Sequence, residues 1–416
     1  IRPTLPERMR LQMALPVRLE FVRDRLHFGH STVDCPVMHG KTVILGGGFA
    51  GLQACRILAR QDGEILLIDP SPVTTMLPAL PDLAGGWVPE QIVSRPLREL
   101  LPAGVDLLSA AATRLDLDQR QIVANGRPVS YDHLLIAAGS VPDFRGTVFP
   151  PGTIHALATL SDALRIRNEF AAYLSATPRP QVLVLGTGYT GLELAMSLHF
   201  RARAAGRSCA ITLADPAPVL LPSLPDRQRQ YVLDFLTSQG ADIRLGASLD
   251  SFDGRRAVVG GRELESPFVC WAGGSTFAVP ELLGHVERLR DGRLVVAPDL
   301  SLPGYPGVFA AGDAAAIRSR GQVLRKAVNF AYYGGRHAAR NMLRLRHGLP
   351  ARPFRPVDLG WIVPLHAASI GRLAPGFWIR GRIGVRLHHL MCGLRNYSLR
   401  HFAGCLRLAL NPNQGA

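Results

Sequence analysis

Two glycine-rich stretches in this 416-residue chain have the residue types and spacing that bind a pyrophosphate. The glycines of LGGGFAGL are Gly46, Gly48 and Gly51, and those of LGTGYTGL are Gly186, Gly188 and Gly191. Each turn follows an apolar run and precedes an apolar-periodic segment, so it would present free N–H groups and the positive end of a helix dipole to a phosphate. The spacing therefore predicts two dinucleotide sites.

An aspartate ends the second apolar run after each turn. Asp69 and Asp215 are placed where a carboxylate can accept hydrogen bonds from ribose hydroxyls. An acid in this position disfavours a 2′-phosphate, so we expect NADH rather than NADPH at the second site. Three arginines lie near it in the sequence and keep NADPH open; they are Arg201, Arg203 and Arg207.

The elements that must position these residues form an internal repeat. Both copies consist of a strand, a glycine turn, a helix, a second strand, an aspartate and a Pro-x-Pro segment, and the second copy is six residues longer, around FRARAAGRS. The pattern predicts an α/β fold with two Rossmann-like dinucleotide-binding domains.

Two further motifs point to a bound ring. YDHLLIAAGS at 131–140 is an apolar strand with a small-residue turn that CWAGG at 270–274 echoes, and GVFAAGDAAAI at 307–317 predicts a buried strand before a helix. At that helix start, the Asp313 carboxylate could bind a sugar-like chain while the dipole faces a ring that becomes anionic on reduction. Asp313 could also simply be an N-cap.

Composition indicates a globular protein with two or three domains. Hydrophobic residues make up 47% and charged residues 19% of the chain, and the net charge is +15. All basic residues except Lys41 and Lys326 are arginine, which indicates a coding bias more than nucleic-acid binding, and no nucleic-acid module is evident. We therefore expect no nucleic-acid partner.

Several other classes of protein are disfavoured. The six cysteines form no CxxC pair, so neither a zinc site nor a disulfide framework is indicated, and we expect no metal. No apolar run reaches the length of a membrane-spanning helix, and the first residues lack the order of a secretory signal. Met38 precedes the first strand, so residues 1–37 are expected to be an extension outside the fold, without regular structure.

The C-terminal residues carry a basic, apolar pattern. From Leu359 onward there is no acidic residue and there are seven arginines. Two helical stripes are expected, one of Ile379, Ile383, Leu387 and Leu390, and one of Leu399, Phe402, Leu406 and Leu410. A basic amphipathic helix pair can lie in the interface of an anionic bilayer, although such helices can also pack on the protein's own core or on a second subunit in a homodimer.

These motifs together resemble the two-dinucleotide-binding-domain flavoproteins of the pyridine nucleotide-disulfide oxidoreductase superfamily, and within them the type II NADH:quinone oxidoreductases. The resemblance runs from Lys41 to the C-terminus. It implies a FAD domain at 38–152 and 281–348, an NAD(H) domain at 153–280 and a membrane-association region at 349–416. It also implies a non-proton-pumping NADH dehydrogenase of the respiratory chain, peripheral on the cytoplasmic face of the inner (plasma) membrane.

The resemblance assigns residues to each cofactor. FAD would be bound by Gly46, Gly48, Phe49, Ala50, Gly51, Asp69, Ala138, Gly139, Gly312 and Asp313. NADH would be bound by Gly186, Gly188, Tyr189, Gly191, Asp215 and Gly273. NADH would pass hydride to the flavin, which would pass electrons on to a quinone.

Three residues are candidates for the chemistry between the cofactors and the acceptor. Glu193 follows the second turn where the first repeat has Gln53, and relatives carry a Glu near the two rings at this position; a first-turn acid that suits the helix dipole is the alternative. Relatives carry an A-Q-x-A-x-Q quinone motif, whereas this chain has Asn329 and Tyr333 in place of the glutamines. That departure weakens the prediction of quinone as the acceptor.

Two other functions remain as alternatives. A sulfide:quinone oxidoreductase would need redox cysteines beside the flavin, for which Cys270 and Cys392 are the only conceivable pair. A soluble NAD(P)H-dependent flavoprotein could instead reduce another acceptor or act as a redox sensor.

Overall fold

The computed structural model describes residues 40–61, 63–279, 281–374, 376–394 and 399–410. The predicted extension at 1–37 lies outside the described residues. The contacts of the chain group Val37–Ala416 into one compact part, which contains both glycine turns and the C-terminal region.

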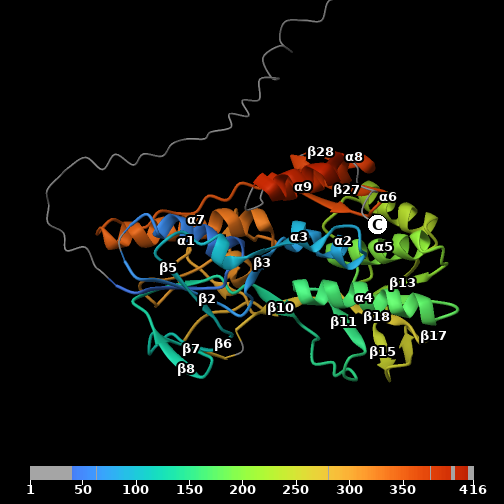
Figure 1. Ribbon diagram of the computed structural model, residues 1–416, viewed down its shortest axis with the longest axis horizontal. Helices are drawn as coiled ribbons and strands as arrows, with labels where there is room; N and C mark the ends of the chain where they lie inside the picture. Colours follow the sequence, from blue (N-terminus) through green and yellow to red (C-terminus); the bar gives the residue numbers. More distant parts are fainter. Residues whose placement is uncertain (1–39, 62, 280, 375, 395–398, 411–416) are drawn as a thin grey trace, which may run out of the picture. The chain divides into compact units, whose positions relative to one another are not determined.

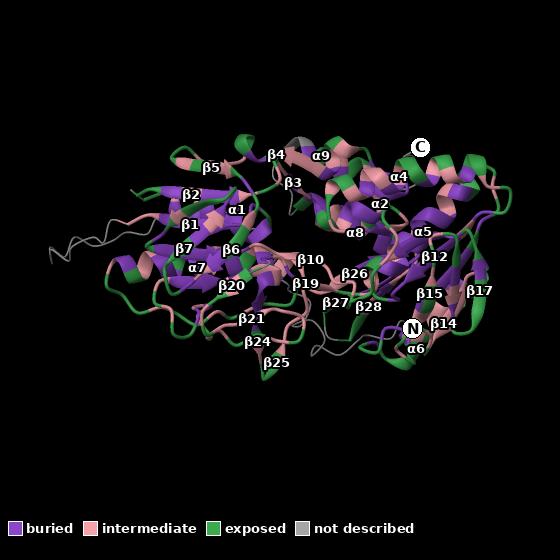
Figure 2. Ribbon diagram, turned by 90° about the horizontal axis from the view of Figure 1, so that it is seen from below, coloured by how far each residue is buried: buried purple, intermediate pink, exposed green. Residues whose placement is uncertain are grey.

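The first layer is a five-stranded parallel sheet with the strand order β22-β9-β1-β2-β5. Its strands are β1 (Thr42–Leu45), β2 (Ile65–Asp69), β5 (Val105–Ser109), β9 (His133–Ile136) and β22 (Val308–Ala310). Strands β1, β9 and β22 are buried along their whole length, which explains why they appear in the sequence as largely apolar runs. Strand β1 is drawn in the buried colour in Figure 2.

The second parallel sheet repeats the first with the order β11-β18-β12-β13-β14. Its strands are β11 (Ile154–Ala156), β12 (Gln181–Leu185), β13 (Ala210–Asp215), β14 (Asp242–Leu245) and β18 (Phe268–Trp271). The glycine-turn strand is central in both sheets, so the predicted duplication of the Rossmann unit is confirmed.

Helices pack against both sheets. They are α1 (Phe49–Leu58), α4 (Leu160–Ala176), α5 (Tyr189–Ala204), α6 (Asp226–Ser238) and α7 (Val328–Arg346). The first unit is the part of the chain built around the first parallel sheet, and the second unit is the part built around the second. Helix α1 packs along α7 in the first unit, and the two lie side by side in Figure 1. Helix α5 has 16 residues and α1 has 10, so the extra length of the second repeat extends its helix.

Antiparallel strands connect and flank the two parallel sheets. One sheet is formed by β20 (Glu281–Leu283), β6 (Ala112–Asp116), β7 (Gln121–Ala124) and β8 (Arg127–Ser130), and another by β15 (Leu249–Phe252), β16 (Arg256–Val259) and β17 (Arg262–Glu265). Strand β10 (Ser140–Pro142) pairs with β19 (Ser275–Phe277), joining segments from the two units. The domain boundaries near 152 and 280 remain predictions.

Short elements complete the description. They are β3 (Val73–Thr75), η2 (Leu77–Ala79), α2 (Leu80–Ala84), α3 (Glu90–Val93), β4 (Ser94–Pro96), η3 (Leu97–Glu99), β21 (Leu294–Val295), η4 (Gly312–Ala314), β23 (Ala315–Ala316), β24 (Arg318–Ser319) and β25 (Gln322–Val323). Helix α2 begins within the Leu-Pro run of the first repeat and packs on α4 and α5 of the second unit.

The C-terminal region contains a sheet that the sequence analysis missed. Strands β26 (Trp361–Pro364), β27 (Ser369–Ala374) and β28 (Phe377–Arg380) form an antiparallel sheet, followed by the paired helices α8 (Arg382–Leu394) and α9 (Leu399–Leu410) (Figure 1). The predicted stripe is therefore wrong at Ile379, which is a buried strand residue. Across the described ranges, no helix has both the length and the apolar character to span a membrane.

Candidate functional site: two dinucleotide cradles and the junction between them

The first glycine turn is held by close backbone contacts that exclude a side chain. Gly46 has φ +108°, and a Cβ there would lie 2.2 Å from the Ala137 carbonyl oxygen. A Cβ on Gly51 would lie 1.8 Å from the carbonyl oxygen of Gly46. Gly48, at the N-cap of α1, faces open space, since a Cβ there would meet nothing within 4 Å.

The second turn repeats this geometry position by position. Gly186 has φ +114° with a Cβ 2.4 Å from the Ala272 carbonyl oxygen, and a Cβ on Gly191 would lie 2.0 Å from the Gly186 carbonyl oxygen. Gly188 again faces open space. Both turns therefore leave the N-terminus of a helix open to a phosphate, as the sequence predicts for a dinucleotide.

The two aspartates brace the turns. Asp69 Oδ2 accepts a hydrogen bond from Gly47 N at 2.6 Å, and Asp215 Oδ2 accepts one from Thr187 N at 2.7 Å. Burial raises the pKa of Asp69, opposed by its backbone hydrogen bonds. Because each carboxylate oxygen has two lone pairs, ribose hydroxyls could still bind to the same groups.

Helix α7 closes over the first turn. A Cβ on Gly335 would lie 2.1 Å from the carbonyl oxygen of Ala50, so the two helices approach more closely than a side chain allows. Phe49 is buried, and Gln53 accepts a hydrogen bond from Arg336 Nη1 at 3.3 Å. This contact brings the start of α7 beside Gly312, whose Cβ would meet Ala50 and Ala331 at 3.4 Å.

Asp313 lies in a 3₁₀ turn and does not start an α-helix. The Ala-rich residues after it form η4 and the short strand β23, and the helix begins only at Val328, so the predicted helix at this position is wrong. Asp313 Oδ2 accepts a weak hydrogen bond from Ser140 Oγ at 3.5 Å. Burial raises the pKa of Asp313, and the charges of Lys326 and Arg293 oppose this.

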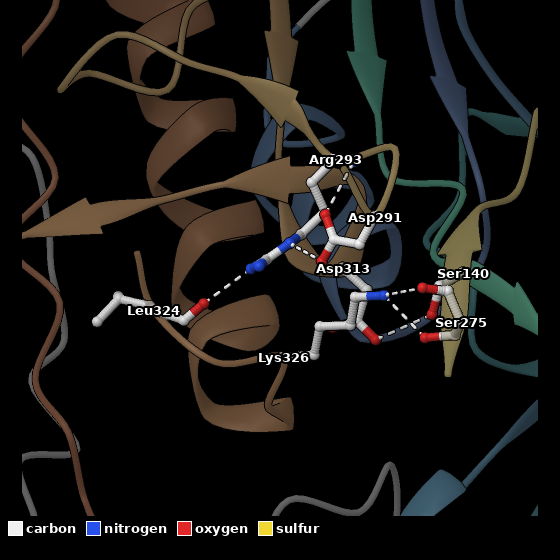
Figure 3. Close-up of polar contacts among 7 residues, drawn as sticks. All are labelled: Ser140, Ser275, Asp291, Arg293, Asp313, Leu324 and Lys326. Carbon is white, nitrogen blue, oxygen red and sulfur yellow. Dashed lines mark hydrogen bonds and ion pairs between the residues drawn. The ribbon is translucent and has the colours of Figure 1, made fainter. Parts of the chain in front are cut away.

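A lysine that the sequence analysis did not select links the two units at this point. Lys326 Nζ donates to the carbonyl oxygen of Ser275 at 3.0 Å and to its hydroxyl at 2.8 Å (Figure 3). Ser275 is in β19 and Ser140 in β10, so both serines of this cluster lie on the strands that pair the two units. The rarity of lysine in this arginine-rich chain is the signal that could have identified it.

An arginine on the other side of Asp313 completes the charge balance. Arg293 donates to Asp291 Oδ2 at 2.7 Å and to the Leu324 carbonyl oxygen at 2.8 Å (Figure 3). Arg293, Asp313 and Lys326 line one small cavity together with Gly312 and Phe330. A buried carboxylate with two cations close by can bind hydroxyl groups while its charge remains compensated.

The residues after the strands β9 and β18 occupy equivalent positions. Gly139 has φ +73° and faces open space, and Ala138 beside it is half-buried. On the second unit, a Cβ on Gly273 would lie 2.8 Å from the Trp271 ring, and Arg145 donates two hydrogen bonds to the Gly273 carbonyl oxygen. These turns flank the two glycine turns in the way the repeat predicts.

Glu193 faces α2 and the C-terminal helices. Its side chain retains some accessible surface, yet the protein around the carboxyl is dense enough that desolvation, with a smaller contribution from Asp82, raises the pKa well above its usual range. The charge of Glu193 also acts on Cys392 of α8. The structure thus brings Glu193 together with Asp82 and Cys392, a neighbourhood that the sequence analysis did not predict.

Asn329 and Tyr333 lie in the first turns of α7. The Asn329 amide donates to the Val357 carbonyl oxygen at 2.7 Å, which ties it to the segment before the C-terminal sheet. Tyr333 is exposed. Tyr189, by contrast, stacks on Trp361 of β26 with ring centroids 5.0 Å apart.

Comparison with known proteins decides the family. A model of the pyridine nucleotide-disulphide oxidoreductases matches residues 40–335, which is most of the chain. A type II NADH:quinone oxidoreductase of Mycobacterium tuberculosis is 31% identical over 336 residues, covering 72% of each chain. This chain belongs to that family. The resemblance inferred from the motifs is confirmed.

Other relatives agree with this assignment. The type II NADH:quinone oxidoreductase of Staphylococcus saprophyticus is 24% identical to this chain. The aligned region covers 79% of this chain and 88% of the relative. The structure of NDH2 from Plasmodium falciparum in complex with NADH superposes with a TM-score of 0.76 at 14% identity, covering 91% and 99% of the two chains. The sulfide:quinone oxidoreductase of Aquifex aeolicus superposes at 0.70 with 19% identity, covering 88% and 92%. The last two show that the fold is shared.

Proposed function

We propose that this protein oxidises NADH and passes the electrons through FAD to a membrane quinone. The observation that carries the proposal is the presence of two glycine turns with matching open geometry in one chain, joined by the charged cluster around Asp313. One turn can hold a cofactor while the other admits and releases a substrate.

We call each glycine turn with its aspartate a cradle. The first cradle, at residues 46–51 and 69, fits FAD. Its three turn glycines, with Phe49 and Ala50, present the α1 N-terminus to a pyrophosphate, and Asp69 braces the turn for the ribose. Ala138 and Gly139 line its edge, and Gly312 and Asp313 would receive the ribityl hydroxyls. Bound FAD supplies a two-electron acceptor that can release its electrons to a second substrate.

The second cradle fits NADH better than NADPH. Asp215 and Thr187 occupy the ribose end, and Gly273 and Tyr189 border the turn. Arg201 and Arg203 lie in the last turn of α5, roughly 20 Å along the helix from Gly188. Arg207 donates to the carbonyl oxygens of Thr177 and Pro178. These contacts support the interpretation that the arginines are not a 2′-phosphate site.

Glu193 is the side chain we assign to the region between the substrate and the flavin. Its raised pKa means that the carboxyl keeps its proton to a higher pH than an exposed Glu would, so it can donate as well as accept a hydrogen bond. We place the quinone beside the start of α7, where the exposed Tyr333 can stack on a ring and Asn329 fixes the adjoining segment.

We assign the membrane contact to the solvent-facing side of α8 and α9. Large apolar side chains lie on this side, where polar ones would be usual. Most buried side chains of the pair are small or polar, among them His388, Cys392 and Cys405, although Val385 is buried with them. The outer face exposes Ile383, Leu394, Leu406 and Leu410 beside Arg382, Arg386 and Arg407. Helices that turn leucines outward beside arginines suit the interface of an anionic bilayer.

This arrangement supports peripheral attachment to the cytoplasmic face of the inner membrane, where NADH and quinone are both accessible. A homodimer formed through the same leucines is the competing arrangement. Flotation of the protein with anionic vesicles, and its loss in Ile383→Ser/Leu394→Ser, distinguishes the two, with Val148→Ser as a control because Val148 is also highly exposed. A variant that still floats while its self-association is lost would favour the dimer.

The cysteines count against a sulfide:quinone oxidoreductase. Cys270 lies in the core strand β18 and Cys392 in α8, and both are free and buried. Burial raises the pKa of both thiols, so the reactive thiolate is disfavoured.

The decisive experiment follows the flavin absorbance. NADH should bleach the flavin of the purified protein, and addition of a quinone should restore the absorbance over many turnovers. Bleaching without reoxidation by quinone would refute the acceptor and leave the soluble reductase or sensor. Bleaching by NADPH at an equal rate would refute the assignment of Asp215.

A further inference from the structure

A second cluster of polar side chains is buried beneath the C-terminal helix pair. Asp82 comes from α2, and the neighbouring His388 and His389 come from α8. The two histidines are 6% and 5% exposed, and one ligand atom from each of the three residues lies within 4.8 Å of the others. Residues more than 300 positions apart therefore converge on one point.

The carboxylate in this cluster has an oxygen without a partner. Asp82 Oδ2 is inaccessible to solvent and accepts no hydrogen bond from any described residue. Burial raises the pKa of Asp82 to about 6, so at neutral pH the carboxyl is still ionised and its charge lacks a hydrogen-bond donor on that side. A buried, unpaired carboxylate is costly unless a cation or a proton satisfies it.

The two imidazole rings are neutral, as rings that coordinate a metal ion must be. Burial lowers the pKa of both His388 and His389 to about 4, which keeps the rings neutral at physiological pH. His388 also contacts Cys392 Sγ through Nε2 at 3.6 Å and faces the backbone at Pro78 and Ile362. Hydrogen bonds of this kind fix the orientation of a metal-binding imidazole.

There is space beside Asp82 and His389. A cavity of about 10 Å³, enough for about one water molecule or ion, is lined by Asp82 and His389 together with His366, Trp87 and Val385. His366 is held between the rings of Trp87 and Phe200, with centroids 4.2 and 4.6 Å away, so it can face the cavity as a further donor.

We propose that Asp82, His388 and His389 bind one divalent transition-metal ion of the zinc class, which fastens α8 to α2. Two imidazole nitrogens and one carboxylate oxygen are the donors that zinc prefers, whereas calcium and magnesium prefer oxygen alone. Bonds of about 2.1 Å require donors about 3.4 Å apart, so modest side-chain rotation from the present spacing suffices. This site is separate from the two cradles, and the ion would also offset the repulsion between Asp82 and Glu193.

Metal content of the intact flavoprotein tests the proposal directly. Tag-free full-length protein is treated with a chelator, dialysed against Zn²⁺ and then against buffer, and its zinc is measured by mass spectrometry. We expect about one zinc per chain. Loading with Co²⁺ should give the visible absorption bands of a four-coordinate nitrogen and oxygen site.

Variants locate the ion. Asp82→Asn and His389→Asn should lose the stoichiometric zinc, and His285→Asn, which changes an exposed histidine elsewhere, should keep it. Flavin content shows that each variant is folded. Absence of zinc from the wild type, or equal zinc in Asp82→Asn and the wild type, would overturn the proposal.

Thermal unfolding provides a second measurement that does not require both variants to fold. Zn²⁺ should raise the Tm of the chelator-treated wild type and leave that of Asp82→Asn unchanged. Without metal, Asp82→Asn should have the higher Tm, because it removes the unpaired charge. A zinc-induced rise in Tm of the same size in both proteins would refute Asp82 as a ligand.

Discussion

The two cradles have nearly the same backbone and different surroundings. At the first, Phe49 is buried, α7 lies against α1 through Gly335, and Gln53 is bound by Arg336. At the second, the equivalent positions carry the half-buried Tyr189 and the acid Glu193, which lies near another acid, Asp82. Duplication thus preserved the open geometry of both glycine turns, while the elements and side chains around the two turns differ.

The third glycines give the largest test of this difference. Gly51→Ala and Gly191→Ala each place a Cβ within 2.0 Å of a backbone oxygen, so both should distort their turns. We expect Gly51→Ala to retain less than about a tenth of its flavin, whereas Gly191→Ala should keep its flavin and show a KM for NADH raised at least about tenfold. Flavin absorbance per protein and steady-state kinetics are the measurements. Equal flavin loss in both variants would contradict the assignment of cofactors to the turns.

The buried carboxyl of Asp82 should make stability depend on pH. Burial raises the pKa of Asp82 from 3.8 to about 6, so the folded state holds its proton more tightly than the unfolded state. The contribution of Asp82 to stability is therefore greatest below about pH 4 and falls as the pH rises to about 6, by on the order of 3 kcal/mol. Asp82→Asn should remove this fall and stabilise the metal-free protein at pH 8. Denaturant unfolding at pH 5 and pH 8 measures both effects, and parallel losses in variant and wild type would contradict them.

Glu193→Gln converts the second cradle to the residue of the first. The variant should keep its flavin and reduce it about tenfold more slowly if Glu193 acts between the substrate and the flavin as we propose, because a titratable group is then lost from that region. Stopped-flow bleaching by NADH across a pH series measures the rate, and the pH dependence due to this carboxyl should disappear. Unchanged rates with reduced flavin content would assign Glu193 a structural role.

The smallest effect that we expect from a difference between the two cradles comes from Thr187. Its hydroxyl donates a second hydrogen bond to Asp215 Oδ2 at 3.0 Å, which Gly47 cannot make to Asp69 in the first turn. Thr187→Ala should weaken NADH binding by about 1 kcal/mol, which corresponds to a roughly fivefold rise in KM for NADH. The flavin content should not change. A KM equal to that of the wild type would show that the hydroxyl does not help to hold the turn.

The features that the sequence predicted are local ones. A glycine turn, its helix and its terminal aspartate lie within about thirty residues, so spacing alone identifies them, and within the two turns Gly46 and Gly186 are the glycines with positive φ. The helix expected at Gly312 and the stripe starting at Ile379 failed because short strands intervene. Periodicity cannot distinguish a strand followed by a helix from one longer helix.

The features that were missed depend on contacts over long sequence distances. Lys326 acquires its position from Ser275 in the other unit, and Asp82 meets α8 only after the chain has folded back. The pattern of α8 identified its apolar stripe, but not that His389, on the other side, would be the buried one. Within the stripe Ile383 is exposed, whereas Leu387 and Leu390 are half-buried.

Lys326 also makes the junction chemically addressable. Lys41 and Lys326 are the only side-chain amines in the chain, and Lys41 is paired with Glu64 at 2.7 Å. Desolvation lowers the pKa of Lys326, opposed by the Asp313 charge, so more of its amine is unprotonated at mild pH than for an exposed lysine. A label attached to the Lys326 amine would therefore report on the place where the two units meet.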